Sequence, residues 1–264
     1  MELLGYIASA LIGLSLGLIG GGGSILTVPV LVYLFGIHPS LAVAYSLFVV
    51  GTTSLIGAFN NYRKNQVDVR VAFLFGISSV ATVVVARKIV MPMVPEHLFQ
   101  IGNISVSKAT ATMIVFALLM LLASSSMIKE KKIDPKPSTG ATLPTLRLPL
   151  YGIGIGLVTG FLGAGGGFLL VPALVLVLKL PMKKAVGTSL FIIALNSLIG
   201  FVAGLQHHPT DWTLLGKVSS LAIVGILVGG RLANFIPGER LKKGFGWFVL
   251  IMGMLIVLQE TIWK

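Results

Sequence analysis

The chain has 264 residues, of which 55% are hydrophobic and 11% charged, and its mean hydropathy is +0.98. A soluble domain carries about 25% charged residues, so most of this surface must face something other than water. The chain has no cysteine, which excludes disulfides and thiolate metal sites. These values predict an all-α, polytopic membrane protein.

Apolar segments alternate with polar stretches along the whole chain, five in each half. The sequence predicts membrane segments at 3–19, 25–36, 41–59, 70–86, 108–128, 148–163, 168–180, 185–205, 213–233 and 244–262. The first of these lacks a positive n-region, so we expect it to be retained and not cleaved as a signal peptide.

Two of the ten segments, 25–36 and 168–180, are about a dozen residues long, or about 18 Å as helices. That length is too short for a hydrocarbon core of about 30 Å. We therefore expect half-helices or the return arms of re-entrant hairpins, which gives eight to ten crossing segments.

The net charge of +12 comes from residues that collect between the apolar segments. No basic face with interleaved aromatic residues is present, so we expect no nucleic-acid partner. The positive-inside rule places the basic loops in the cytoplasm and both termini outside. The predicted inside loops are 60–70, 129–147, 179–184 and 231–243, and the predicted outside loops are 36–40, 87–108 and 206–212.

A glycine-rich phrase occurs twice in the chain. Residues 17–29 read GLIGGGGSILTVP, and residues 160–172, 143 positions later, read GFLGAGGGFLLVP. The same spacing relates SLF at 46–48 to SLF at 189–191, which indicates two copies of one structural unit. Because five segments per copy is an odd number, the second copy enters the membrane inverted, a plan common in secondary transporters. The predicted domains are an N-terminal repeat (1–128), a cytoplasmic linker (129–147) and a C-terminal inverted repeat (148–264).

The clustered glycines interrupt apolar sequence, where broken backbone is tolerated only if it is buried in protein or lines a polar cavity. The half-helices that follow, starting near Ser24 and Phe168, would present free N–H groups and a positive dipole end, a ready anion site. Two inverted copies would aim two such ends at one central point. By contrast, the Gly13-x-x-x-Gly17 and Gly225-x-x-x-Gly229 patterns indicate close helix packing.

The third segment of each repeat carries polar residues within apolar sequence. Positions 46 and 53, like 189 and 196, are seven apart and so share one helix face. These side chains could line an oxyanion cavity. For single hydroxyls, hydrogen bonds to the backbone of the same helix are the favoured alternative, whereas Asn196 is costlier to bury unpaired. The candidate substrate-binding residues are Gly21, Gly22, Gly23, Ser24, Ser46, Thr52, Thr53, Gly165, Gly166, Gly167, Ser189, Asn196 and Ser197.

Groups that serve catalysis or proton coupling are missing from the apolar segments. No Asp or Glu lies in the middle of a segment, which argues against a carboxylate proton relay. All four histidines lie in loops, and there is no Walker phosphate loop or His-Glu-x-x-His metal motif. We expect no enzyme activity, no cofactor and no metal.

The duplicated glycine phrase with its closing proline, followed by AVAYSLF at 42–48 and AVGTSLF at 185–191, resembles the sulfite exporter TauE/SafE family of permeases. Members of this family are linked to sulfite, sulfoacetate, other organosulfonates and related small anions, so the resemblance implies a transporter of a sulfur-containing anion. Tyr45 replaces the Thr188 of the second repeat; the hydroxyl is kept but the ring is larger.

The residues and the family resemblance both predict an anionic substrate. A cytoplasm negative by about 100 mV favours expulsion of each unit negative charge by about 2.3 kcal/mol, so export could run on membrane potential alone. We expect a multi-pass protein of the cytoplasmic membrane that exports sulfite or a small organosulfonate by alternating access. The alternatives are an ion-coupled importer of an organosulfonate or other small acid, a passive anion channel, and a non-transporting scaffold. The expected partners are the small sulfur-containing anion and the lipid bilayer. A homodimer is a possible assembly.

Overall fold

The computed structural model describes residues 2–21, 23–86, 89, 93, 97–101, 104–128, 147–162, 167–204 and 211–262. Each of the ten predicted apolar segments forms a helix, which confirms an all-α membrane protein. The elements are α1 (Glu2–Ile19), α2 (Gly23–Tyr33), α3 (Pro39–Arg63), α4 (Val69–Val85), β1 (His97–Ile101), β2 (Ile104–Ser107), α6 (Lys108–Ile128), α7 (Arg147–Leu162), α8 (Gly167–Pro172), the π-helix η2 (Ala173–Val177), α9 (Met182–Gly204), α10 (Trp212–Phe235) and α11 (Gly238–Ile262).

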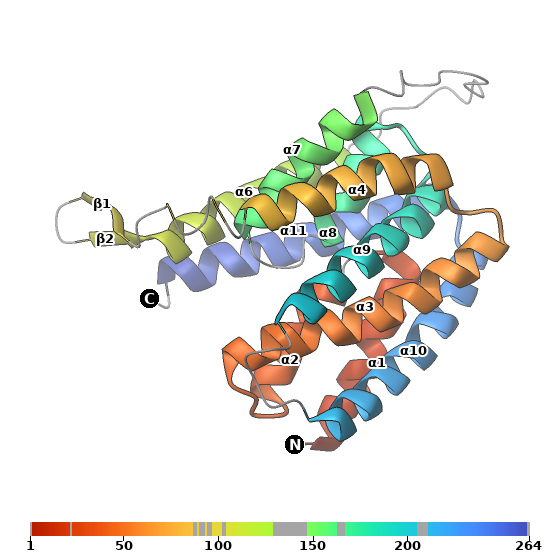
Figure 1. Ribbon diagram of the computed structural model, residues 1–264, viewed down its shortest axis with the longest axis horizontal. Helices are drawn as coiled ribbons and strands as arrows, with labels where there is room; N and C mark the ends of the chain where they lie inside the picture. The colour runs from red at the N-terminus through yellow and green to blue at the C-terminus, as the bar shows by residue number, and fades with distance from the viewer. Residues whose placement is uncertain are drawn as a thin grey trace.

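Within the described part of the chain, three helices are both long and apolar enough to cross a membrane: Leu41–Arg63, Met182–Val202 and Trp212–Phe235. They belong to α3, α9 and α10, which lie side by side (Figure 1). The third segment of each repeat, where the candidate hydroxyl and amide residues lie, is therefore a helix long and apolar enough to cross a membrane.

One predicted loop contains regular structure. Within the stretch 87–108, β1 and β2 pair antiparallel and project from one end of the molecule (Figure 1). The sequence contains a signal for this hairpin: two short runs with β-branched and aromatic residues flank the Gly-Asn pair at 102–103. The predicted loop did not include it.

The short helix α2 runs back along α1. Gly23, at the start of α2, lies against α1, where an added Cβ would meet the Ile12 carbonyl oxygen at 2.5 Å. Just beyond the end of α2, Phe35 packs against Tyr6 near the start of α1, with ring centroids 5.3 Å apart. Segment 25–36 therefore folds back along α1, and we call α2 the return arm of the first repeat. In the second repeat the return arm α8 changes to a π-helix directly after Pro172, whose ring removes an amide donor from the helix.

Helices of one repeat pack against helices of the other, in symmetric pairs. Helix α1 pairs with α10, and its counterpart α7 pairs with α4, while α3 pairs with its own counterpart α9 and α6 with α11. In the α1–α10 pair, a methyl group on Gly13 would overlap the Ala222 carbonyl oxygen and one on Gly225 would overlap the Ala10 carbonyl oxygen. The predicted packing role of the two small-residue patterns is confirmed. The two repeats thus interlock along their length.

Two equivalent hydrogen bonds join the repeats at opposite ends of the bundle. The Asp211 N–H donates to the Tyr45 hydroxyl (2.7 Å), and the Asp68 N–H donates to the Thr188 hydroxyl (2.9 Å). Both aspartates also cap the helix that follows, α10 and α4 respectively. Each donor and each acceptor is 143 positions from its counterpart, so the tertiary structure follows the repeat found in the sequence.

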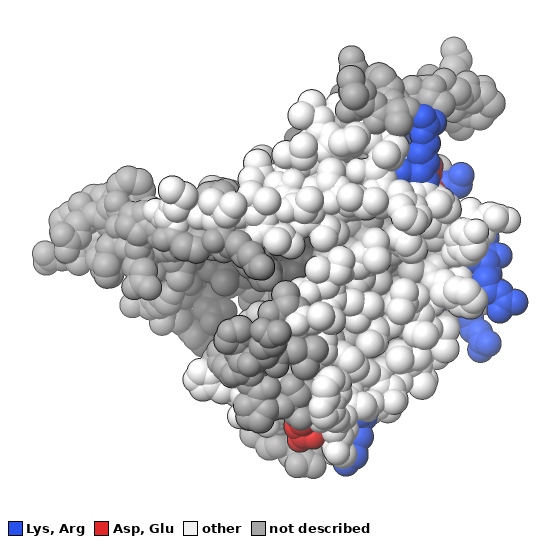
Figure 2. Space-filling model, in the orientation of Figure 1, with Lys and Arg blue, Asp and Glu red and all other residues white. Residues whose placement is uncertain are grey.

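The predicted basic loops that the structure describes meet at one end of the bundle, formed by the end of α3, the end of α10 and the starts of α9 and α11; we call it the basic end. There the Lys64 Nζ donates to the Gly230 carbonyl oxygen (3.4 Å) and the Lys183 Nζ to the Asn234 carbonyl oxygen (3.1 Å). Figure 2 shows most of the visible Lys and Arg side chains along one edge. Most of the predicted linker, 129–146, falls outside the described residues.

The α1–α10 contact gives a direct test. Gly225→Ala would place a methyl group against the Ala10 carbonyl, and we expect a loss of about 1–3 kcal/mol in the free energy of unfolding from overpacking. Gly216→Ala, in the same helix but with nothing within 4 Å, should leave stability unchanged or raise it by up to about 1 kcal/mol. Thermal unfolding of both variants in detergent measures the difference. Equal midpoints would contradict the packing assignment.

Candidate functional site

The turn between α1 and α2 is built on a left-handed glycine. Gly20 has φ +81°, its N–H donates to the Leu16 carbonyl oxygen (2.7 Å), and its own carbonyl accepts from the Ser189 hydroxyl on α9 (3.4 Å). A side chain at Gly20 would also press on Ser189 and Val186. Gly20 was absent from the candidate residues, although a glycine directly after a helix is a known signal for this conformation.

The start of the first return arm meets the start of the second. A methyl group on Gly167, the first residue of α8, would lie 3.1 Å from the Ser24 hydroxyl of α2 and 2.9 Å from Ile193. Ile193 lies midway along α9, so both return arms begin beside the middle of this helix. The sequence-derived expectation that the two starts converge on one point agrees with this geometry.

Buried polar atoms without partners lie on the two central helices. The Thr53 hydroxyl on α3 and the Asn196 side-chain oxygen on α9 are buried and make no hydrogen bond, and the two residues occupy equivalent positions of the repeat. Asn196 follows Ile193 by one helical turn, on the face that meets Gly167. An unsatisfied buried polar group costs about 1–3 kcal/mol.

Ser54 also has a buried hydroxyl without a partner, although it was not among the candidate residues. Its counterpart Ser197, which was a candidate, is 2% exposed. Serines are common in apolar segments, so the sequence alone did not single out Ser54 as a binding residue.

Other candidate hydroxyls bond to the backbone of their own chain segment. Ser46 donates to Val43 (2.7 Å), its counterpart Ser189 to Val186 (2.8 Å), and Thr52 to Phe48 (2.8 Å). Ser24 donates to the Gly21 carbonyl of the turn (2.8 Å). These bonds follow the alternative favoured for single hydroxyls. They leave the hydroxyl oxygens in place as acceptors while the protons are engaged.

The glycine candidates divide into two groups. Gly21 and Gly23 are buried at the first turn, and Gly167 is buried at the start of α8. Gly22, Gly165 and Gly166 fall outside the described residues. All the candidate residues are uncharged. An anion here would therefore be held by neutral donors whose protons are not engaged, such as the Thr53 hydroxyl, and by the N-terminal end of α2, where the helix dipole is positive.

A family model described as "Sulfite exporter TauE/SafE" matches residues 6–256. The relatives include a "Probable membrane transporter protein" of Xylella fastidiosa, 27% identical and covering 95% of this chain and 92% of its own length. Two Bacillus subtilis proteins are similar: "Probable membrane transporter protein YdhB" is 27% identical over 94% of this chain and 96% of its own, and "Probable membrane transporter protein YunE" is 28% identical over 97% and 96%. No solved structure gives a significant match.

The glycine turn can be tested with a matched pair of substitutions. Gly20 and Gly36 both have positive φ, but a Cβ at Gly36 would have nothing within 4 Å, whereas one at Gly20 would lie 2.9 Å from the Ser189 hydroxyl. Gly36→Ala should cost about 1–2 kcal/mol for the left-handed backbone alone. Gly20→Ala should lower the unfolding midpoint further, because Ser189 and Val186 must also move. Thermal unfolding checks this, and an equal loss at the two positions would contradict the close approach.

Proposed function

We propose a substrate and a direction for this chain, which belongs to the sulfite exporter TauE/SafE family and is a membrane transporter. The substrate is sulfite or a small organosulfonate, which the protein exports across the cytoplasmic membrane by alternating access. The substrate lies where the two return arms meet, between α3 and α9. The multi-pass arrangement has the basic end in the cytoplasm.

This proposal rests on the contact between Ser24 of α2 and Gly167 of α8 beside α9. It is supported by the buried polar atoms without partners at Thr53 and Asn196. The Thr53 hydroxyl has a proton to donate, and rotation of the Asn196 amide about its last bond presents its NH₂ group in place of the oxygen. Sulfur oxyanions offer acceptors in several directions and suit several neutral donors. A helix start adds positive potential without a fixed cation.

The direction follows from the electrostatics of the membrane. The binding residues carry no charge, so a bound anion moves with its negative charge uncompensated. At about 100 mV, inside negative, outward movement gains about 2.3 kcal/mol per unit charge. Export therefore needs no coupling ion, whereas uptake of the same anion would.

The test is efflux of labelled sulfite from proteoliposomes containing the purified full-length protein, with and without an inside-negative potential. Efflux should rise with the potential. Thr53→Val and Asn196→Ala should each reduce it about tenfold or more, since a hydrogen bond to a charged group contributes about 1.5–3 kcal/mol. Thr82→Val is the matched control, because this threonine bonds within its own helix to the Ser78 carbonyl (2.7 Å) and lies outside the proposed path.

The competing functions give different results in the same vesicles. Taurine, sulfoacetate and sulfate are added as competitors to define the substrate. Sulfoacetate uptake driven by a sodium or proton gradient, without sulfite movement, would overturn export in favour of import. Flux without trans-stimulation by unlabelled substrate would indicate a channel. Equal efflux by the Thr53, Asn196 and Thr82 variants would place the substrate path elsewhere.

A further inference from the structure

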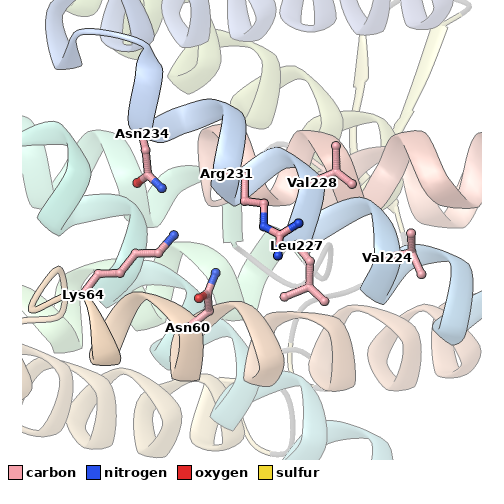
Figure 3. Close-up of a pocket in the computed structure, with 7 residues that line it drawn as sticks. All are labelled: Asn60, Lys64, Val224, Leu227, Val228, Arg231 and Asn234. Carbon is pink, nitrogen blue, oxygen red and sulfur yellow. The ribbon is translucent and has the colours of Figure 1, made fainter.

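A pocket that the proposed transport path does not use opens between α3 and α10, near the basic end. It has a volume of about 510 Å³. Asn60 and Lys64 reach it from α3, and Arg231 and Asn234 reach it from α10; the polar heads of these four side chains point into the same space (Figure 3). Two cations and two amides thus face one cavity.

The charge in this pocket is one-sided. None of the residues that line it is a carboxylate. Burial lowers the pKa of Lys64, and the nearby positive charge of Arg231 lowers it further. Holding two cations close together without a counter-charge is unfavourable. An anion between them would remove the repulsion and engage the guanidinium, whose fork geometry suits phosphate.

The remaining wall of the pocket is aliphatic and open to the outside of the bundle. Val224, Leu227 and Val228 line it and are 57%, 38% and 43% exposed. They precede Arg231 by one to two helical turns on α10, within the segment Trp212–Phe235 that is apolar enough to cross a membrane. Exposed aliphatic side chains on such a segment suit contact with acyl chains. An adjoining face of α10, at Gly225 and Gly229, is covered by α1.

A small hydrophilic anion would use the cations but not the aliphatic wall. The volume also lies within the roughly 300–1,000 Å³ range of sites for larger molecules. A molecule with an anionic head and an apolar tail uses both parts. Basic pockets between membrane helices are known to bind phospholipid head groups.

We propose that this pocket binds an anionic phospholipid from the leaflet at the basic end. Lys64 and Arg231 contact the phosphodiester, and Asn60 and Asn234 bind oxygens of the head group. One acyl chain follows Val224, Leu227 and Val228 along α10. The bound lipid bridges the ends of α3 and α10, so its binding stabilises their contact.

The test is lipid binding to the delipidated full-length protein in detergent, measured by native mass spectrometry and by the shift of the thermal unfolding midpoint. The probes are phosphatidylglycerol, phosphatidylcholine, glycerol 3-phosphate and inorganic phosphate. We expect phosphatidylglycerol to bind at least tenfold more tightly than the other three and to raise the midpoint. K64Q/R231Q should weaken phosphatidylglycerol at least tenfold.

The matched control is K184Q/R240Q, which removes two positive charges from the same end but outside the pocket. It should change phosphatidylglycerol affinity less than twofold. Equal weakening by the two double variants would mean non-specific attraction to the basic end and would overturn the proposal. If K64Q/R231Q does not fold, R231Q alone is compared with R240Q in the same way.

The aliphatic wall is tested separately. L227S/V228S should weaken phosphatidylglycerol several-fold while leaving any weak glycerol 3-phosphate binding unchanged. Tight binding of glycerol 3-phosphate or inorganic phosphate that is lost in K64Q/R231Q would identify a site for a free anion and overturn the lipid assignment. None of these measurements depends on transport, so their outcome is distinct from that of the sulfite assay.

Discussion

The constraint on which this structure depends is that a backbone turn inside an apolar medium must have its polar groups satisfied by protein, because lipid offers none. At the first turn the Gly20 amide bonds within α1, and the Gly20 carbonyl lies 3.4 Å from the Ser189 hydroxyl, which shares its one proton between Gly20 and Val186. Ser189 belongs to the other repeat. The turn of the first half therefore lies beside α9 of the second half, while α1 packs on α10 and α7 on α4.

Hydrophobic segmentation and the repeat could be read from the sequence because both are local or periodic signals. Ten apolar runs became ten helices, and the 143-residue register recurs in the equivalent bonds of Tyr45 and Thr188. The basic loops could be assigned to one end for the same reason. Sequence could not show that α2 folds back along α1, because this arrangement rests on contacts such as Tyr6 with Phe35, which are distant along the chain.

The candidate residues show which features of the site the sequence could not predict. The glycine phrases pointed to Ser24 and Gly167, which the structure brings together, while their role in binding substrate stays a prediction. Hydroxyl groups alone did not reveal which were already bonded: Thr52 bonds within its helix, whereas its neighbour Thr53 has no partner. The proposed phospholipid pocket could not be predicted from the sequence, because Lys64 and Arg231 belong to different repeats and come together only through the packing of α3 on α10.

The departures from exact repetition bear on how a two-fold arrangement can favour one direction. Two identical repeats would give inward-open and outward-open states of equal energy, and neither would be preferred without substrate. Here the equivalent bonds at the two ends differ, since a long tyrosine reaches Asp211 where a short threonine reaches Asp68. The equivalent central positions differ as well, with Thr53 on α3 and Asn196 on α9. Under the proposed alternating access, opening one end would break a different bond from opening the other, so the two states would differ in energy. The membrane potential would then act on an equilibrium that is asymmetric in the sequence itself.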